Sequence, residues 1–156
     1  MNGSTPKIRK SKSVTQKFNL GDYRLEDQIG FIIRKSGQRH AATFMSLMIE
    51  DLTPTQWAAL VKVAELNAVS QNQLGRDTAM DVSTIKGVVD RLIKRGFVTT
   101  SPDLTDIRRN VIALTPKGEI IINQGLPVAS KISEATMEGL SIGEKQMLIE
   151  LLRKIT

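Results

Sequence analysis

Residues 70–115 carry, in close succession, the signals of a short helix, a tight turn, a longer helix and two strands. The stretch Ser70–Gln73 is a capping pattern that predicts a short helix ending near Thr78. Ala79–Asp81 predicts a tight turn, and the aspartate at its end is a favourable cap for a longer helix that Gly96 ends. This order constrains the segment to a helix-turn-helix.

Two runs of strand-forming residues, Val98–Ser101 and Asn110–Thr115, follow the longer helix. The polar stretch between them holds Asp106, Arg108 and Arg109, so the two runs predict a β-hairpin with a long charged tip. A helix-turn-helix followed by such a hairpin is the layout of a winged helix-turn-helix, in which the longer helix enters the major groove of DNA.

Helical patterns also precede this segment. Apolar residues at helical spacing predict a long first helix from Leu25 to about Ile49. Thr53–Gln56 combines a capping hydroxyl, a proline at the first helical position and a glutamine that can reach back to the cap. We therefore expect a second helix that runs to about Leu66.

Two further helices follow the hairpin. Thr115 caps a helix that continues to about Met137, and we expect Gly125 and Pro127 to kink it. Ser141 opens a capping box before a final helix with a narrow apolar stripe, which favours packing against a partner helix. The predicted fold is mainly α with a small β-hairpin wing (α+β), divided into a flexible basic arm (1–20), a helical dimerisation region (21–50 and 116–156) and a winged helix-turn-helix DNA-binding lobe (51–115).

The composition bounds the class of protein. The chain has 156 residues, 40% of them hydrophobic, and its apolar runs fall far short of the ~18 residues of a transmembrane helix. It has no secretory signal, so we expect a soluble cytoplasmic protein without membrane contact. The absence of cysteine excludes disulfides, thiolate metal sites and a cysteine-based peroxide switch, and we expect no cofactor or metal.

The net charge of +6 is weak evidence for a nucleic-acid partner. Most of this excess comes from residues 1–24, which carry six basic side chains against one acidic one. Such an arm is either a solvated disordered segment or a DNA contact, and the composition favours the solvated segment.

The longer helix has an apolar stripe that runs from Ile85 to Ile93. If this stripe is buried, one face of the helix points outward and can meet DNA. Small hydroxyls near its start suit base edges, cations further along suit phosphates, and a glycine permits close approach of the backbone. The alternative is an ordinary amphipathic helix with a solvated polar face. The candidate DNA-contacting residues are Ser83, Gly87, Arg91 and Lys94, with Thr84 and Lys86 on the flanks.

The hairpin tip adds candidates of a second kind. Arg108 can enter the narrow minor groove of A·T-rich DNA, where the negative potential is enhanced, and Asp106 can orient its guanidinium. Arg109 lies beside it. The alternative is a surface salt bridge that contributes ~0–1 kcal/mol and has no function.

Two motifs carry a resemblance to a known family. Asp106-Ile107-Arg108, then five residues, then Leu114–Gly118 is similar to the wing signature of MarR-family regulators. Asp90–Phe97 resembles the end of their recognition helix. The similarity covers about Leu25 to Thr156. It implies that the first and the last two helices intertwine two subunits, that Ser83, Thr84, Lys86 and Arg91 meet the major groove, and that Arg108 meets the minor groove.

The stretch Tyr23–Phe31, together with Gln38–His40, resembles regulators of aromatic-acid catabolism in that family, including repressors of nicotinate degradation. This resemblance implies a small aromatic carboxylate effector, with 6-hydroxynicotinate as the leading candidate, bound between the dimerisation helices and the DNA-binding lobe. The candidate effector residues are Arg39 and His40 for the carboxylate and Phe44 and Trp57 for the ring. In the simpler interpretation, His40 is a surface or interhelical histidine and the two aromatic residues belong to an ordinary core.

The predicted function is therefore a repressor that reads a pseudo-palindromic operator as a homodimer and is released by this effector. An enzyme is disfavoured because His40 is the only histidine and the chain has neither a Walker A loop nor a Gly-x-Gly-x-x-Gly turn. The sequence is also compatible with an architectural DNA-binding protein that ignores base sequence, and with a winged helix that serves only protein contact.

Overall fold

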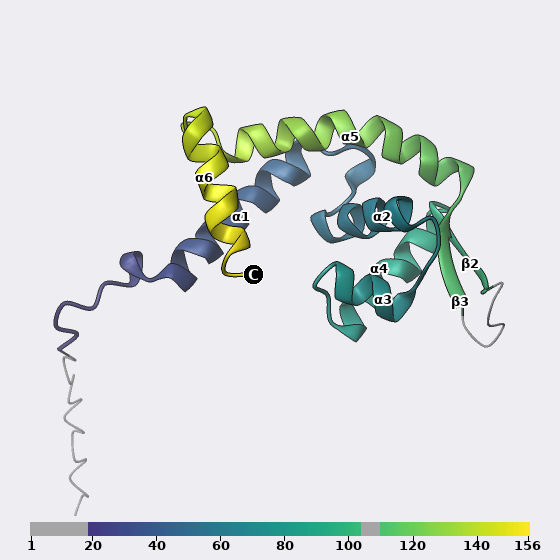
Figure 1. The fold of residues 1–156 in the computed structure, drawn as a ribbon, viewed down its shortest axis with the longest axis horizontal. Coiled ribbons are helices and arrows are strands. Elements are labelled where there is room, and N and C mark those ends of the chain that lie inside the picture. The colour runs from purple at the N-terminus through teal and green to yellow at the C-terminus, as the bar shows by residue number, and fades with distance from the viewer. Residues whose placement is uncertain (1–18, 104–109) are drawn as a thin grey trace, which may run out of the picture.

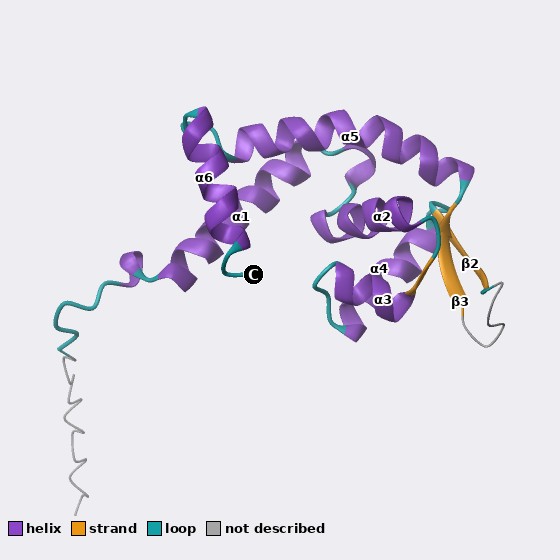
Figure 2. Ribbon diagram, in the orientation of Figure 1, coloured by secondary structure: helices purple, strands orange, loops and turns teal. Residues whose placement is uncertain are grey.

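The computed structural model describes residues 19–103 and 110–156, so the predicted basic arm lies outside it except for Asn19 and Leu20. Within the described residues the fold is mainly α with a small sheet, as predicted (Figures 1 and 2). The helices are α1 (Ile29–Leu47), α2 (Pro54–Leu66), α3 (Gln71–Asp77), α4 (Val82–Lys94), α5 (Pro116–Thr136) and α6 (Ile142–Arg153), and the strands are β1 (Val69–Ser70), β2 (Val98–Pro102) and β3 (Asn110–Leu114).

Two groups of elements share the long helix α5. Near its first residues lie α2, α3, α4 and the sheet, which together form the winged unit, residues 54–114 (Figure 1). Near its last residues lie α1 and α6 (Figure 1). α5 packs against both α1 and α2, so it joins the two groups.

The turn between α3 and α4 forms as predicted. Ala79 adopts a left-handed backbone conformation (φ 52°), and the Met80 N–H donates a hydrogen bond to the Gly75 carbonyl at 2.9 Å. A Cβ on Gly75 would lie 3.2 Å from Ile85 Cγ2, so the glycine permits α3 and α4 to pack closely. The helix-turn-helix geometry thus follows from the turn residues and this close approach.

The apolar face of α4 holds this helix in the winged unit. Ile85, Val88, Val89 and Leu92 are buried, and α4 packs against α2, α3 and β2. Ile93, which the predicted stripe included, is 40% exposed. It lies about 100° from Leu92 around the helix, beyond the edge of the buried face.

The three strands form an antiparallel sheet in the order β1-β3-β2. The predicted hairpin pairs Val98 with Leu114 at its base, and its tip, residues 104–109, lies outside the described residues. The sequence reasoning missed β1. This strand has only Val69 and Ser70, and Ser70 also caps α3, so the capping signal obscured the strand.

The first helix begins later than predicted. Leu25–Asp27 form a separate 3-10 turn, and Gln28 adopts an extended conformation (φ −83°, ψ 125°) before α1 begins at Ile29. Apolar spacing alone does not separate such a turn from the first turn of a helix, because both place residues three apart on the same side.

α5, which is expected to kink at Gly125 and Pro127, continues through both residues as one helix. Gly125 faces the ring of Trp57 on α2, and an added Cβ would lie 2.5 Å from the Cη2 and Cζ3 atoms. The glycine therefore permits close packing of α5 against α2. No helix in the described ranges is both long and apolar enough to cross a membrane.

Gly118→Ala tests the second close approach of α5. An added Cβ would lie 2.0 Å from the Phe97 carbonyl oxygen, and a main-chain atom cannot rotate away. We expect the substitution to lower the free energy of unfolding by at least about 2 kcal/mol, as measured by urea denaturation.

The matched control is Gly87→Ala in α4, where an added Cβ would meet only the flexible end of Arg91, at 3.4 Å. We expect this variant to gain about 0.5–1 kcal/mol because alanine is the better helix residue. A Gly118→Ala protein as stable as the parent would contradict the observed packing.

Candidate nucleic-acid interface

The face of α4 opposite the core is open to solvent. Ser83, Arg91 and Lys94 are exposed, and Gly87 is half-buried. Thr84 and Lys86, predicted on the flanks, are exposed as well. The structure therefore places all six predicted α4 residues where another molecule can reach them.

Asp81 organises the start of this face. Its carboxylate accepts hydrogen bonds from Ser83 Oγ at 2.7 Å, from the Thr84 N–H at 2.8 Å and from Thr84 Oγ1 at 2.9 Å. These three bonds, led by the Ser83 hydroxyl, lower the pKa of Asp81 to about 2. The sequence identified Asp81 as the helix cap, but its bonds to the two hydroxyls emerge only from the structure.

The charged residues along α4 differ in their surroundings. Lys86 donates to the Asp90 carboxylate at 2.8 Å one turn later, and this bond raises the pKa of Lys86. Within the described ranges, Arg91 and Lys94 form no ion pair. The Arg91 guanidinium lies near the space that Gly87 leaves open. Arg91 and Lys94 are therefore the stronger candidates for contact with an anion.

A polar surface cavity of about 460 Å³ lies between the start of α3 and the sheet. Ser70, Gln71, Asn72, Arg76 and Asn110 line it. The sequence reasoning did not select these residues, because capping explained Ser70–Gln73 and Asn110 was assigned only to a strand. Their proximity depends on the pairing of β1 with β3, which the sequence did not reveal.

The wing candidates Asp106, Arg108 and Arg109 lie outside the described residues. The strands on either side are described, and Pro102 of β2 pairs with Asn110 of β3. The predicted roles of these three side chains therefore remain predictions.

The structure brings some of the effector candidates together. On α1, the rings of His40 and Phe44 lie edge to face, with their centroids 5.9 Å apart. His40 Nδ1 is 3.0 Å from Thr136 Oγ1 of α5, and Arg39 is exposed. Phe44 and Trp57 are buried in the core. These four residues line neither the cavity at the start of α3 nor a second surface cavity, between α3 and the start of α4.

A model of the MarR family matches residues 52–111, from just before α2 into β3. The HTH-type transcriptional repressor NicR of Pseudomonas putida is 37% identical over 134 residues, which are 85% of this chain and 85% of NicR. The chain belongs to the MarR family.

Two solved structures support this assignment. A probable transcriptional regulator from Pseudomonas aeruginosa has a TM-score of 0.83 and 48% identity, covering 85% of this chain and 100% of that one. Bordetella bronchiseptica BpsR, whose DNA binding is described as regulated by 6-hydroxynicotinic acid, has a TM-score of 0.81 and 34% identity, covering 86% and 97%. The predicted MarR-family fold is confirmed, and these relatives are transcriptional regulators rather than enzymes.

Asp81→Asn tests the electrostatics at the start of α4. Because the pKa of Asp81 is lowered from 3.8 to about 2, its charged form stabilises the fold above about pH 4, and this contribution is lost as the pH falls to about 2. Asparagine also caps helices but does not titrate. We expect the stability difference between the parent and Asp81→Asn to change across this window and to stay constant above it, as measured by denaturant unfolding.

Ser83→Ala provides the intermediate case. It removes the bond that lowers the pKa of Asp81 most, so the pH dependence of its unfolding should be shallower than that of the parent. Parallel stability curves for the parent and Asp81→Asn from pH 4 to pH 2 would show that Asp81 does not titrate as described.

Proposed function

We propose that this protein is a transcriptional repressor that reads a pseudo-palindromic DNA operator as a homodimer. The observation that carries the proposal is the exposed face of α4, which presents two hydroxyls at its start and the cations Arg91 and Lys94 further along. Hydroxyls suit base edges and cations suit phosphates. The relative NicR is named a transcriptional repressor, which supports repression rather than activation.

The helical region, residues 21–50 and 116–156, would form the dimer interface. In support, α6 has no buried residue, and an isolated helix with so many exposed apolar side chains is unfavourable in water. A two-fold dimer would place two α4 helices in successive major grooves, about 34 Å apart. The exposed apolar residues of α6 are Ile142, Met147, Leu148, Ile149, Leu151 and Leu152.

The wing would add contacts in the minor groove. By family resemblance, Arg108 would enter the groove. Asp106, two residues earlier in the sequence, would orient its guanidinium, and Arg109 is the third candidate. In the proposed division of the chain, residues 51–115 would form one DNA-binding lobe that holds α4 and the wing.

We further propose a small aromatic carboxylate, 6-hydroxynicotinate first, as the effector. The relation to BpsR supports this choice, since BpsR is described as regulated by 6-hydroxynicotinic acid. Arg39 or protonated His40 would pair with the carboxylate, and Phe44 or Trp57 would contact the ring. The effector must bind more tightly to a form whose α4 helices are misplaced for successive grooves, because a ligand shifts an equilibrium only by its differential affinity.

Lys94→Ala and Ser83→Ala test the DNA contacts. The probes are a duplex that the parent protein selects from a random-sequence pool and a scrambled duplex of equal length. We expect Lys94→Ala to weaken binding to both duplexes alike and to reduce the salt slope of binding by about 1, because it removes a phosphate contact. Ser83→Ala should weaken binding to the selected duplex only.

Lys62→Ala, on α2, is the matched control for the loss of one positive charge, because Lys62 pairs with Glu65 and lies outside both the proposed DNA-contacting face and the proposed dimer interface. It should leave both affinities unchanged. Equal binding of the two duplexes by the parent protein at all salt concentrations would favour a sequence-indifferent DNA-binding protein and contradict the proposal.

Calorimetric titration tests the effector. Hydroxylated nicotinates and benzoates are added to the free protein and to its complex with the selected duplex. We expect 6-hydroxynicotinate to bind the free protein and to release the duplex, and Arg39→Ala to weaken its binding. If no compound binds, or one binds without loosening the complex, the effector proposal is wrong while the DNA-binding proposal stands.

A further inference from the structure

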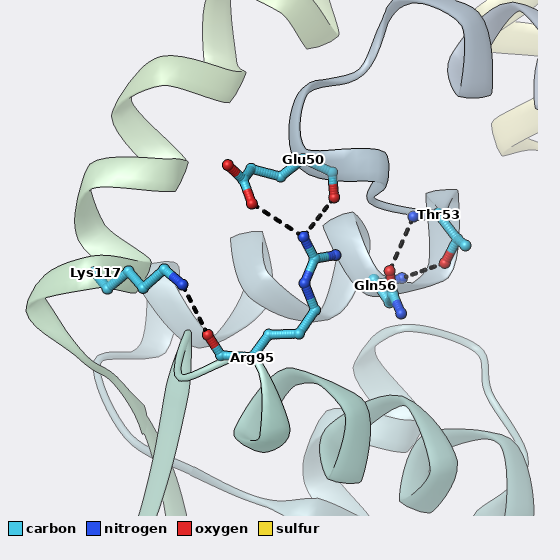
Figure 3. Close-up of polar contacts among 5 residues, drawn as sticks. All are labelled: Glu50, Thr53, Gln56, Arg95 and Lys117. Carbon is cyan, nitrogen blue, oxygen red and sulfur yellow. Dashed lines mark hydrogen bonds and ion pairs between the residues drawn. The ribbon is translucent and has the colours of Figure 1, made fainter.

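Both chain connections between the winged unit and the long helices pass the C-terminal end of α4. Residues 48–53 connect α1 to α2, and Thr115 connects β3 to α5. Arg95, the residue that follows α4, lies between the two connections, with Glu50 of the first on one side and Lys117 of α5 on the other (Figure 3). We refer to Glu50, Arg95, Phe97 and Lys117 as the linker cluster.

Arg95 binds Glu50 at two points. Its Nη2 donates to the Glu50 main-chain carbonyl at 2.5 Å and to the Glu50 carboxylate at 3.1 Å (Figure 3). A guanidinium that binds a carbonyl and a carboxylate of the same residue restricts both the main chain and the side chain of that residue. The contact joins positions 45 residues apart in the sequence.

The contact with Arg95 matters because the backbone conformation of Glu50 is energetically unfavourable. Glu50 (φ 54°) and Asp51 (φ 46°) both adopt the left-handed conformation, which side chains other than glycine rarely take. Two consecutive residues of this kind persist only where surrounding contacts hold them. Arg95 provides the contact at Glu50.

The other side of Arg95 is held by α5. Lys117 Nζ donates to the Arg95 main-chain carbonyl at 3.1 Å (Figure 3). The Arg95 guanidinium and the Lys117 ammonium lie 4.7 Å and 4.9 Å from the centroid of the buried Phe97 ring. Cations at this distance from an aromatic ring are attracted to it. The end of α4 is therefore fixed to the 48–53 connection and to the first turn of α5.

We propose that Arg95 is a positioning residue, which sets the orientation of α4 relative to the long helices by holding the 48–53 connection in its left-handed conformation. The proposal rests on the DNA-reading role proposed above for α4, since that role requires the two α4 helices of a dimer to match the spacing of the DNA grooves. Arg95 acts through the backbone of Glu50 and touches no base.

Distance measurements between two spin labels test the orientation directly. The chain has no cysteine, so Val82→Cys on α4 and Lys131→Cys on α5 provide two unique labelling positions, both exposed. Dilution with excess unlabelled protein restricts the signal to label pairs within one chain. We expect a narrow distance distribution in the parent and a broader or shifted one in Arg95→Gln.

Arg34→Gln is the matched control. Arg34 also lies over a phenylalanine ring, 5.1 Å from the Phe31 centroid, but both residues belong to α1. Its distance distribution should equal that of the parent. If Arg95→Gln does not fold, Glu50→Gln and Arg95→Lys provide the test, because each retains part of the contact and should give a smaller broadening. Unchanged distributions in the Arg95 and Glu50 variants would overturn the proposal.

DNA binding provides a second readout, which a purely stabilising role would not change. The probes are the selected duplex and the same duplex with one base pair inserted between its half-sites. We expect the parent to bind the duplex with the original spacing more tightly than the one with the insertion. In Arg95→Gln the ratio of these two affinities should be about tenfold smaller, equivalent to about 1.4 kcal/mol. An unchanged preference would overturn the proposal. If the parent selects no duplex while Arg95→Gln still alters the distances, the positioning role stands and the proposed DNA-reading function fails.

Discussion

The orientation of α5 relative to the winged unit depends on the main-chain carbonyl of Phe97. This carbonyl accepts hydrogen bonds from the Thr115 N–H at 3.1 Å and from Thr115 Oγ1 at 3.3 Å, just before α5 begins. Gly118 permits the first turn of α5 to approach this carbonyl, and the Phe97 ring is fully buried. The end of α4, the start of β2 and the start of α5 therefore meet around one peptide group, and the direction of α5 relative to the winged unit follows from it.

The parts of the fold that the sequence predicted well are those with local causes. Capping bonds at Thr53, Ser70, Asp81, Thr115 and Ser141 all join residues three positions apart, so the pattern of residue types is sufficient to locate these helix starts. The exposed face of α4 was predicted for the same reason, since helical periodicity determines it once the buried stripe is known.

The features that escaped prediction depend on distant partners. β1 exists only because β3 pairs with it, and the Arg95–Glu50 contact joins residues whose types carry no signal of their separation in space. Gly125 was expected only to kink α5, but it also lies against Trp57, a contact that no local pattern of the α5 sequence indicates. Tertiary contacts thus decide what a glycine or an arginine does, and a single sequence does not contain them in readable form.

At the start of α4, the hydroxyls of Ser83 and Thr84 are the donors in their hydrogen bonds to Asp81. A carboxylate can only accept, so Ser83 and Thr84 point their hydroxyl protons at Asp81 and leave only lone pairs free for another partner. A base that meets these oxygens must supply the proton itself. In the major groove, the amino groups of adenine and cytosine do so, whereas guanine offers N7 and O6 and thymine offers O4, all acceptors. In the DNA-reading role proposed for α4, the polarity of these two hydroxyls would therefore favour adenine and cytosine over guanine and thymine.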